Sequence, residues 1–337
     1  MKLAVLGLGC WGLVLTKLLT DNFDKITGWS RREDLSDELV KYKRTTKPFN
    51  VQLDEKVEIT DNLKEAIKDA DIILLVVATS AIRAVCKQLA EAGIKDEQIL
   101  VNASKGLEQG SLKRMSEVIK DELPNQKIAV LSGPTLALEV LDGQPTAACA
   151  ASDDIEIAKK VQKALNVKNK FRLYTNNDLI GVELGGSLKN VIAIAAGFLD
   201  GMNFGDNSKG ALLTRGMAEI VRVGVYLGAN PSTLWGLSGM GDLIATCNSR
   251  LSRNNTVGRL LAQGKKIDDI LSELGSVAEG VKTSKVITEL ADKINIETPV
   301  SNAVYKAVYS KENSKELFLE LMNRALKGEE TFVKTGG

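Results

Sequence analysis

The chain contains no histidine, so any proton transfer that it catalyses must use lysine, aspartate, glutamate, tyrosine or cysteine. Histidine is the side chain whose ordinary pKa lies near neutral pH, and its absence excludes Ser-His and Cys-His pairs and histidine-ligated zinc. A lysine can act as the acid or base when apolar surroundings lower its affinity for a proton. Lysines that follow strands or lie on apolar helices are therefore the first candidates for chemistry.

Lys189 is the strongest of these candidates. It lies in the stretch GVELGGSLKN at 181–190, which leads into the apolar helical pattern of 191–197. At 100° per residue, Gly181, Gly185 and Lys189 fall within an arc of about 80° on one helix face. The helical turns beside Lys189 then carry no bulk, and another group can pack closely there. Spacing alone equally allows a lysine that ends an exposed stripe.

Other polar groups follow predicted strands or glycine turns. Lys105 comes after the strand at 99–101, and the turn GPTLA at 133–137 comes after the strand at 128–131. Ligands of open α/β folds bind at the carboxyl ends of the strands, so both positions are candidate binding sites. A simple strand-ending turn is the alternative for 133–137.

A third cluster follows the turn GMGDL at 239–243. Its residues Ser252, Arg253 and Asn254 combine a guanidinium fork with two neutral donors, a set that suits a phosphate. Many such triplets are only solvated helix starts. Asp242 can orient a lysine or a substrate hydroxyl, or it can simply cap a helix.

A glycine-rich loop, GLGCWG at 7–12, follows the first predicted strand and begins the first helix. In that position the glycines allow a tight turn, close approach of a pyrophosphate and close packing of helix on strand, so we expect dinucleotide binding. Where an NAD-selective fold usually supplies an acidic residue, this chain has Arg31 and Arg32, which suit a 2′-phosphate. We therefore expect NADPH to be preferred, with NADH possible. The alternative is a solvated helix start, because two acidic residues follow.

The remaining pattern predicts an α/β fold of two domains. Short β-rich runs at 3–6, 25–29, 72–77, 99–101 and 128–131 alternate with helical patterns, which indicates a Rossmann-type, doubly wound parallel sheet covered on both faces. Strand signals nearly vanish after residue 180. We expect a dinucleotide-binding domain at 1–180, an all-helical substrate domain at 181–327 and a loose tail at 328–337.

Composition restricts the partners. The 337 residues carry 44 Lys and Arg against 43 Asp and Glu, and 4% are aromatic, so a nucleic-acid partner is disfavoured. Four cysteines without CxxC spacing indicate reduced thiols, and no metal site is expected. The longest apolar runs are too short for a membrane span, and no signal peptide is apparent. We expect a cytoplasmic protein.

Taken in order, these motifs resemble those of the prokaryotic NAD(P)-dependent glycerol-3-phosphate dehydrogenases. The resemblance runs from residue 1 to about 327 and rests on 7–12, 104–106, 133–137, 181–186 with 189–193, 213–216, 239–243, 252–254 and 277–280. It implies reversible reduction of dihydroxyacetone phosphate to sn-glycerol 3-phosphate, which feeds glycerophospholipid synthesis.

The resemblance also implies the roles of individual residues. Lys189 would be the general acid/base, and the residues around the substrate would be Lys105, Gly133, Thr135, Lys189, Asp242, Ser252, Arg253 and Asn254. The dinucleotide would contact Gly7, Gly9, Cys10, Trp11, Gly12, Arg31, Arg32, Lys105, Ala137, Arg253, Val277 and Glu279.

Two other functions fit the same two-domain plan. A 6-phosphogluconate-type or β-hydroxyacid dehydrogenase also uses a lysine on the first long helix, although the loop at 252–254 argues against it. A dinucleotide sensor without catalysis would keep only the first domain's function, but Lys105, Lys189 and Asp242 argue against that. A largely helical second domain commonly supplies a dimer face, so we expect a homodimer.

Overall fold

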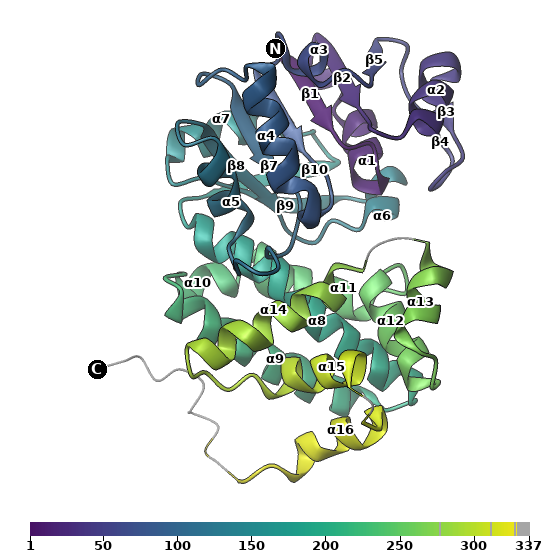
Figure 1. The fold of residues 1–337 in the computed structure, drawn as a ribbon, viewed down its shortest axis with the longest axis vertical. Helices are drawn as coiled ribbons and strands as arrows, with labels where there is room; N and C mark the ends of the chain where they lie inside the picture. Colours follow the sequence, from purple (N-terminus) through teal and green to yellow (C-terminus); the bar gives the residue numbers. More distant parts are fainter. Residues whose placement is uncertain (276–277, 311, 327, 329–337) are drawn as a thin grey trace. The chain divides into compact units, whose positions relative to one another are not determined.

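The computed structural model describes residues 1–275, 278–310, 312–326 and 328. The chain forms two compact units (Figure 1). The sheet unit comprises 1–104 and 115–179, and the helical unit comprises 105–114 and the chain from 180 onward. The chain passes from the sheet unit to the helical unit between residues 179 and 180, near the expected boundary. Segment 105–114, which we expected in the first domain, groups with the helices. Apart from Gly328, the expected tail lies outside the described residues.

The sheet unit is built on one eight-stranded sheet in the order β10-β9-β8-β7-β6-β1-β2-β5. Its strands are β1 (Lys2–Leu6), β2 (Lys25–Trp29), β5 (Val57–Thr60), β6 (Ile72–Leu75), β7 (Ile99–Asn102), β8 (Lys127–Ser132), β9 (Thr146–Ala151) and β10 (Phe171–Asn176), with a separate ribbon of β3 (Arg44–Thr45) and β4 (Val51–Gln52). The chain order reverses between β1 and β6, so these strands form the switch point where ligands of such sheets bind.

The sheet differs from the all-parallel expectation at one pair, because β8 and β9 run antiparallel. The sequence analysis also did not identify β5, β9 and β10. The sequence of β9, TAACAA, has one β-branched residue, Thr146, and no aromatic residue, and four of its six residues are alanine, so it carries little of the signal that marks a strand. Pairing with its neighbours, rather than local preference, makes this segment a strand.

Helices cover the sheet on both faces: α1 (Cys10–Leu18), α2 (Glu33–Tyr42), α3 (Leu63–Ile67), α4 (Ile82–Ala92), α5 (Met115–Glu122), α6 (Ala137–Leu141) and α7 (Ile155–Leu165), with short 3-10 turns at Thr20–Asn22 and Thr79–Ala81. Alternate strand residues enter different cores. Leu3 and Val5 pack with α1 and α7, whereas Ala4 and Leu6 pack with α3, α4 and α5. This two-sided burial explains why the central strands are continuous apolar runs.

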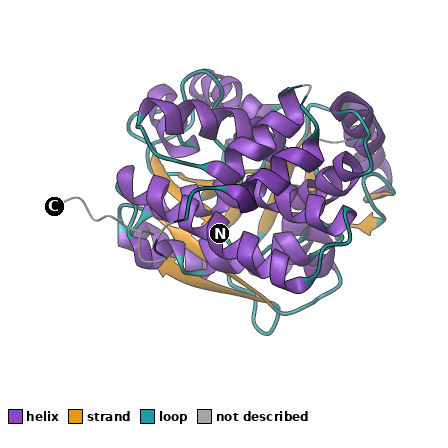
Figure 2. Cartoon of the chain, turned by 90° about the horizontal axis from the view of Figure 1, so that it is seen from below, coloured by secondary structure: helices purple, strands orange, loops and turns teal. Residues whose placement is uncertain are grey.

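The helical unit has no strand among its described residues, and Figure 2 shows by colour how much of the chain is helix. Its helices are α8 (Leu179–Gly201), α9 (Asp206–Tyr226), α10 (Pro231–Leu234), α11 (Asp242–Asn248), α12 (Arg253–Ala262), α13 (Ile267–Leu274), α14 (Glu279–Lys293), α15 (Pro299–Tyr309) and α16 (Ser314–Glu320), with a π-helical turn at Leu237–Gly241 and a 3-10 turn at Leu321–Asn323.

Helix α8 is the centre of this unit. Within the part of the chain that the structure describes, it is the one helix long and apolar enough to cross a membrane, but 94% of that stretch is buried inside the protein. Close contacts explain its glycines: a β-carbon at Gly197 would lie 2.0 Å from the Asn255 carbonyl oxygen of α12. Its apolar length is therefore that of a core helix surrounded by other helices.

Candidate active site

The glycine loop at 7–12 lies at the switch point of the sheet, between β1 and α1. Gly7 has a φ of +106°, and a β-carbon there would lie 2.6 Å from the Val76 carbonyl oxygen. A β-carbon at Gly12 would lie 1.9 Å from the Gly7 carbonyl oxygen, whereas one at Gly9 would meet no atom within 4 Å. The loop is thus closed toward the sheet and open at Gly9, where α1 begins without a side-chain cap. An uncapped helix start with open space before it fits a pyrophosphate.

The first two residues of α1 contribute differently. The Trp11 ring meets the Phe171 ring edge-on with centroids 6.3 Å apart, so this side chain packs against the core of the sheet unit. Cys10 is half-buried and has a free thiol. The Trp11 side chain is half-buried, so part of the ring stays accessible beside the loop.

Arg31 and Arg32 follow β2, the strand next to β1. Both side chains are exposed, and Arg32 pairs with Asp34 at 3.2 Å between Nη2 and Oδ2. Because this pair is 53% and 72% exposed, it binds weakly and can be exchanged for a phosphate. Both arginines lie where a ribose 2′-substituent is read in folds of this kind.

The turn after β8 holds the other sheet-unit candidates. Gly133 has a φ of +145°, and the Thr135 hydroxyl donates to its carbonyl oxygen at 3.1 Å. Ala137 is the first residue of the short helix α6. All three residues lie at the same edge of the sheet as the glycine loop.

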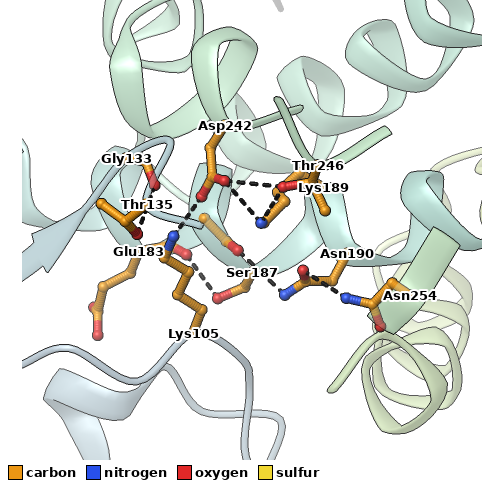
Figure 3. A network of polar contacts seen from close by, with 11 residues as sticks. Lys105, Gly133, Thr135, Glu183, Ser187, Lys189, Asn190, Asp242, Thr246 and Asn254 are labelled. Carbon is orange, nitrogen blue, oxygen red and sulfur yellow. Dashed lines mark hydrogen bonds and ion pairs between the residues drawn. The ribbon is translucent and has the colours of Figure 1, made fainter. Parts of the chain in front are cut away.

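In the helical unit, one carboxylate joins two lysines (Figure 3). Asp242 Oδ1 lies 2.8 Å from Lys189 Nζ, and Asp242 Oδ2 lies 2.7 Å from Lys105 Nζ. Lys189 and Asp242 are 5% and 2% exposed. The structure therefore brings together three of the predicted site residues from three separate segments of the chain.

Thr246 belongs to the same cluster, although the sequence analysis did not single it out. Its Oγ1 accepts a hydrogen bond from Lys189 Nζ at 2.5 Å and donates to Asp242 Oδ1 at 3.0 Å. Thr246 follows Asp242 by four residues, so the two share one face of α11. That spacing was the available signal. With these partners, the Lys189 amine is held at a fixed point.

The glycine face of α8 allows this approach. A β-carbon at Gly185 would lie 2.9 Å from Gly239 Cα and from the Ser238 carbonyl oxygen. The π-helical turn that contains these two residues leads directly into Asp242. The close packing expected beside Lys189 is present. It places the Asp242 carboxylate within hydrogen-bond distance of the Lys189 amine.

Burial and mutual charge set the protonation of the cluster. Burial lowers the pKa of Lys105 to about 8; the Asp242 carboxylate opposes this effect and the Lys189 charge adds to it. For Asp242, burial favours the neutral acid, but the charges and hydrogen bonds of Lys105 and Lys189 hold its pKa below the ordinary value. The cluster therefore contains one carboxylate between two amines.

The triplet at 252–254 begins helix α12, and its members have different surroundings. Ser252 is the N-cap, and its Oγ accepts from the Asn255 backbone N–H at 3.2 Å. Buried Asn254 donates to Asn190 Oδ1 at 2.9 Å and accepts from the Gly280 N–H at 3.0 Å. Arg253 is exposed and has no ion pair with any described residue. Its guanidinium is therefore the available group of the triplet for an anion.

One of the predicted cofactor residues begins α14. Glu279 is its first residue and is half-buried. Val277 lies outside the described residues.

A Rossmann-type sheet with a dinucleotide loop, joined to a helical unit that carries a lysine–aspartate–lysine cluster, defines an NAD(P)-dependent oxidoreductase. Residues 2–158 match the family described as NAD-dependent glycerol-3-phosphate dehydrogenase N-terminus, and residues 178–319 match its C-terminus. The chain belongs to the glycerol-3-phosphate dehydrogenases.

Similar proteins agree with this assignment. The glycerol-3-phosphate dehydrogenase (NAD(P)+) of Streptococcus uberis is 45% identical over 97% of this chain and 98% of its own. That of Pediococcus pentosaceus is 46% identical over 96% and 97%. The crystal structure of glycerol-3-phosphate dehydrogenase from Coxiella burnetii has a TM-score of 0.91 and 34% identity, covering 96% of this chain and 99% of that one.

Proposed function

We propose that this enzyme interconverts dihydroxyacetone phosphate and sn-glycerol 3-phosphate, with NADPH as the preferred reductant and Lys189 as the general acid/base. The observation that carries the proposal is the contact of Asp242 with both Lys189 and Lys105. When bound, the dinucleotide supplies hydride chemistry at carbon 2 of the substrate. The protein's own groups must then bind the phosphate and supply one proton.

Lys189 would supply that proton from Nζ to the oxygen on carbon 2. The amine donates hydrogen bonds to Asp242 and Thr246, and the Thr246 hydroxyl donates to Asp242. The position of the amine is therefore fixed before substrate arrives. After transfer, the neutral amine keeps both contacts and regains a proton from solvent. In the oxidative direction the neutral amine takes the hydroxyl proton.

Two protonated lysines and one carboxylate leave the cluster with one net positive charge. That charge favours an anionic substrate, and Arg253 adds an exposed cation on the same unit. Ser252, Asn254, Gly133 and Thr135 would add neutral donors. Phosphate binding would orient the reacting carbon, so the phosphate should raise kcat as well as lower KM.

The dinucleotide would be held by the loop at 7–12, by Arg31 and Arg32 at the ribose, and by Lys105, Ala137, Arg253, Val277 and Glu279. The open space at Gly9 and the exposed arginines support this proposal. The product has the phosphorylated three-carbon skeleton of a glycerophospholipid, which supports a role in phospholipid synthesis; we propose that this takes place in the cytoplasm. We also propose a homodimer.

The test is to follow NADPH and NADH oxidation with dihydroxyacetone phosphate and, separately, with dihydroxyacetone. We expect turnover of the phosphate ester, and for the free ketone a lower kcat and a higher KM. Equal efficiency with dihydroxyacetone would contradict the roles of Arg253 and Asn254. Tight NADPH binding without turnover would contradict the proposed reaction altogether.

A further inference from the structure

Segment 105–114, which we call the strap, belongs to the helical unit although the chain on both sides belongs to the sheet unit. Both of its end residues pair with carboxylates of the helical unit. Lys105 Nζ lies 2.7 Å from Asp242 Oδ2, and Arg114 Nη1 lies 2.7 Å from Glu183 Oε2. The Lys105–Asp242 pair belongs to the cluster described above, whereas the Arg114–Glu183 pair lies outside that cluster.

The strap is closed on itself by backbone pairing between its two arms. Leu107 and Arg114 form an antiparallel bridge, and the Glu108 N–H donates to the Lys113 carbonyl oxygen at 2.9 Å. Leu107 is 3% exposed in the core of the helical unit. Because Leu107 is only two residues from Lys105, this bridge is the path by which a displacement of Arg114 would reach the amine.

The Arg114–Glu183 pair is well placed to hold the strap. The Arg114 side chain is 16% exposed and that of Glu183 is 4% exposed. If the pair were broken, water could therefore solvate neither charge well. Glu183 lies on α8 six residues before Lys189 (Figure 3). The pair therefore ties the far end of the strap to the helix that carries Lys189.

We propose that Arg114 is a positioning residue for the reaction: its ion pair with Glu183 holds the strap so that Lys105 is aligned with Asp242. The inference rests on the proposed function only in giving Lys105 a role toward the substrate. Arg114 acts through Lys105 and does not itself touch the substrate.

A double-mutant cycle tests the proposal. The enzyme carries Arg114→Met, Lys105→Met or both, and kcat/KM for dihydroxyacetone phosphate is measured. If Arg114 acts through Lys105, Arg114→Met lowers kcat/KM about tenfold in the native background, a coupling of about 1.4 kcal/mol, and has almost no effect once Lys105 is methionine. Arg114→Lys, which keeps the charge, restores part of the loss. Equal factors in both backgrounds would overturn the proposal, because a merely structural role acts independently of Lys105.

A matched control removes another arginine–carboxylate pair. Arg83 Nη1 lies 2.6 Å from Glu122 Oε1 in the sheet unit, and we expect Arg83→Met to leave kcat/KM unchanged. If Arg114→Met does not fold, Glu183→Gln removes the negative charge of the same pair while keeping the shape of the side chain, and the cycle is run with it.

A second readout needs no turnover. The rate at which acetic anhydride modifies Lys105, followed by peptide mass spectrometry, should rise several-fold in Arg114→Met and stay unchanged in Arg83→Met. An unchanged rate at Lys105 would overturn the inference even if the proposed substrate were wrong. Absence of turnover in the native enzyme would instead contradict the proposed function.

Discussion

Asp242 Oδ1 lies 2.8 Å from Lys189 Nζ, although 53 residues separate them in the chain. Both side chains are almost completely buried, so the contact exchanges hydration for a charge-assisted hydrogen bond in a medium of low dielectric. Removing Asp242 would leave the buried Lys189 amine without its carboxylate, whereas removing Lys189 would leave Asp242 paired with Lys105 alone. We therefore expect substitution of either residue to lower stability and, if the proposed function holds, activity.

Replacing Lys189 by methionine should lower kcat by a factor of about 10²–10⁴, the range for loss of a general acid. The fold should persist, because methionine keeps most of the volume. Steady-state kinetics and circular dichroism measure the two effects. Lys265→Met is the control: it removes an exposed lysine paired with Glu273, and kcat should not change. Near-native turnover of Lys189→Met would exclude Lys189 as the acid.

The pH dependence of kcat/KM should report Lys105. Its pKa of about 8 means that the cation is present below this pH and is lost as the pH rises through it. Because an anionic substrate needs the cation, kcat/KM for reduction should fall with a midpoint near pH 8.

Asp242→Asn should move that midpoint to lower pH, since the carboxylate raises the pKa of Lys105 and the amide does not. Lys105→Arg, which stays charged, should abolish the decline near pH 8. A profile that is the same in all three proteins would assign the titration to another group.

Gly185→Ala tests the packing that brings Asp242 to Lys189. The added β-carbon would lie 2.9 Å from backbone atoms of Ser238 and Gly239, so the turn must shift. We expect a loss of about 1–3 kcal/mol in the free energy of unfolding together with a fall in kcat. Gly210→Ala is the control, since a β-carbon there meets nothing within 4 Å and alanine favours the helix. Parallel behaviour of the two variants would contradict the packing argument.

Glu219 should make stability depend on pH. Its carboxylate caps α15, accepting from the Val300 N–H at 2.5 Å and from the Ser301 N–H at 3.1 Å. Burial nevertheless raises its pKa to about 7, from 4.5. The folded state thus binds a proton that the unfolded state releases, so the stabilisation is complete below pH 4.5 and is lost as the pH rises through about 7.

Urea unfolding at pH 5 and pH 8 measures this effect. We expect the difference in unfolding free energy between the native protein and Glu219→Gln to shift in favour of the native protein at pH 5. A difference that does not change with pH would show that Glu219 does not titrate in this range.

Arg31→Ala and Arg32→Ala should reduce kcat/KM for NADPH more than for NADH. Loss of one arginine–phosphate contact should cost about tenfold for NADPH, because only NADPH carries the 2′-phosphate. The control is Lys41→Ala, an exposed cation at the last turn of α2. Equal efficiency with both cofactors, unaltered by either arginine substitution, would remove the predicted preference.

Several site residues could be predicted because local sequence carries their signal. The loop at 7–12 is recognisable from its glycine spacing directly after a strand pattern, although the atom that Gly7 approaches, the Val76 carbonyl oxygen, belongs to a distant segment. The glycine spacing before Lys189 likewise reveals a face that another segment can approach. By contrast, Trp11 carries no sign that its ring packs on Phe171, 160 residues later, because that contact exists only when the sheet is formed.

The sequence by itself determined the alternation of strands and helices in the sheet unit, the helical character of the second unit, the cofactor loop and, by lacking histidine, the exclusion of that side chain from any proton transfer. These properties follow from periodicity, glycine placement and composition, all of which are local. The tertiary structure decided that Lys105 and Lys189 share one carboxylate, that Thr246 joins them, and that the strap belongs to the helical unit. Distances between segments far apart in the chain depend on how helices pack, and no local pattern encodes which buried charge will meet which.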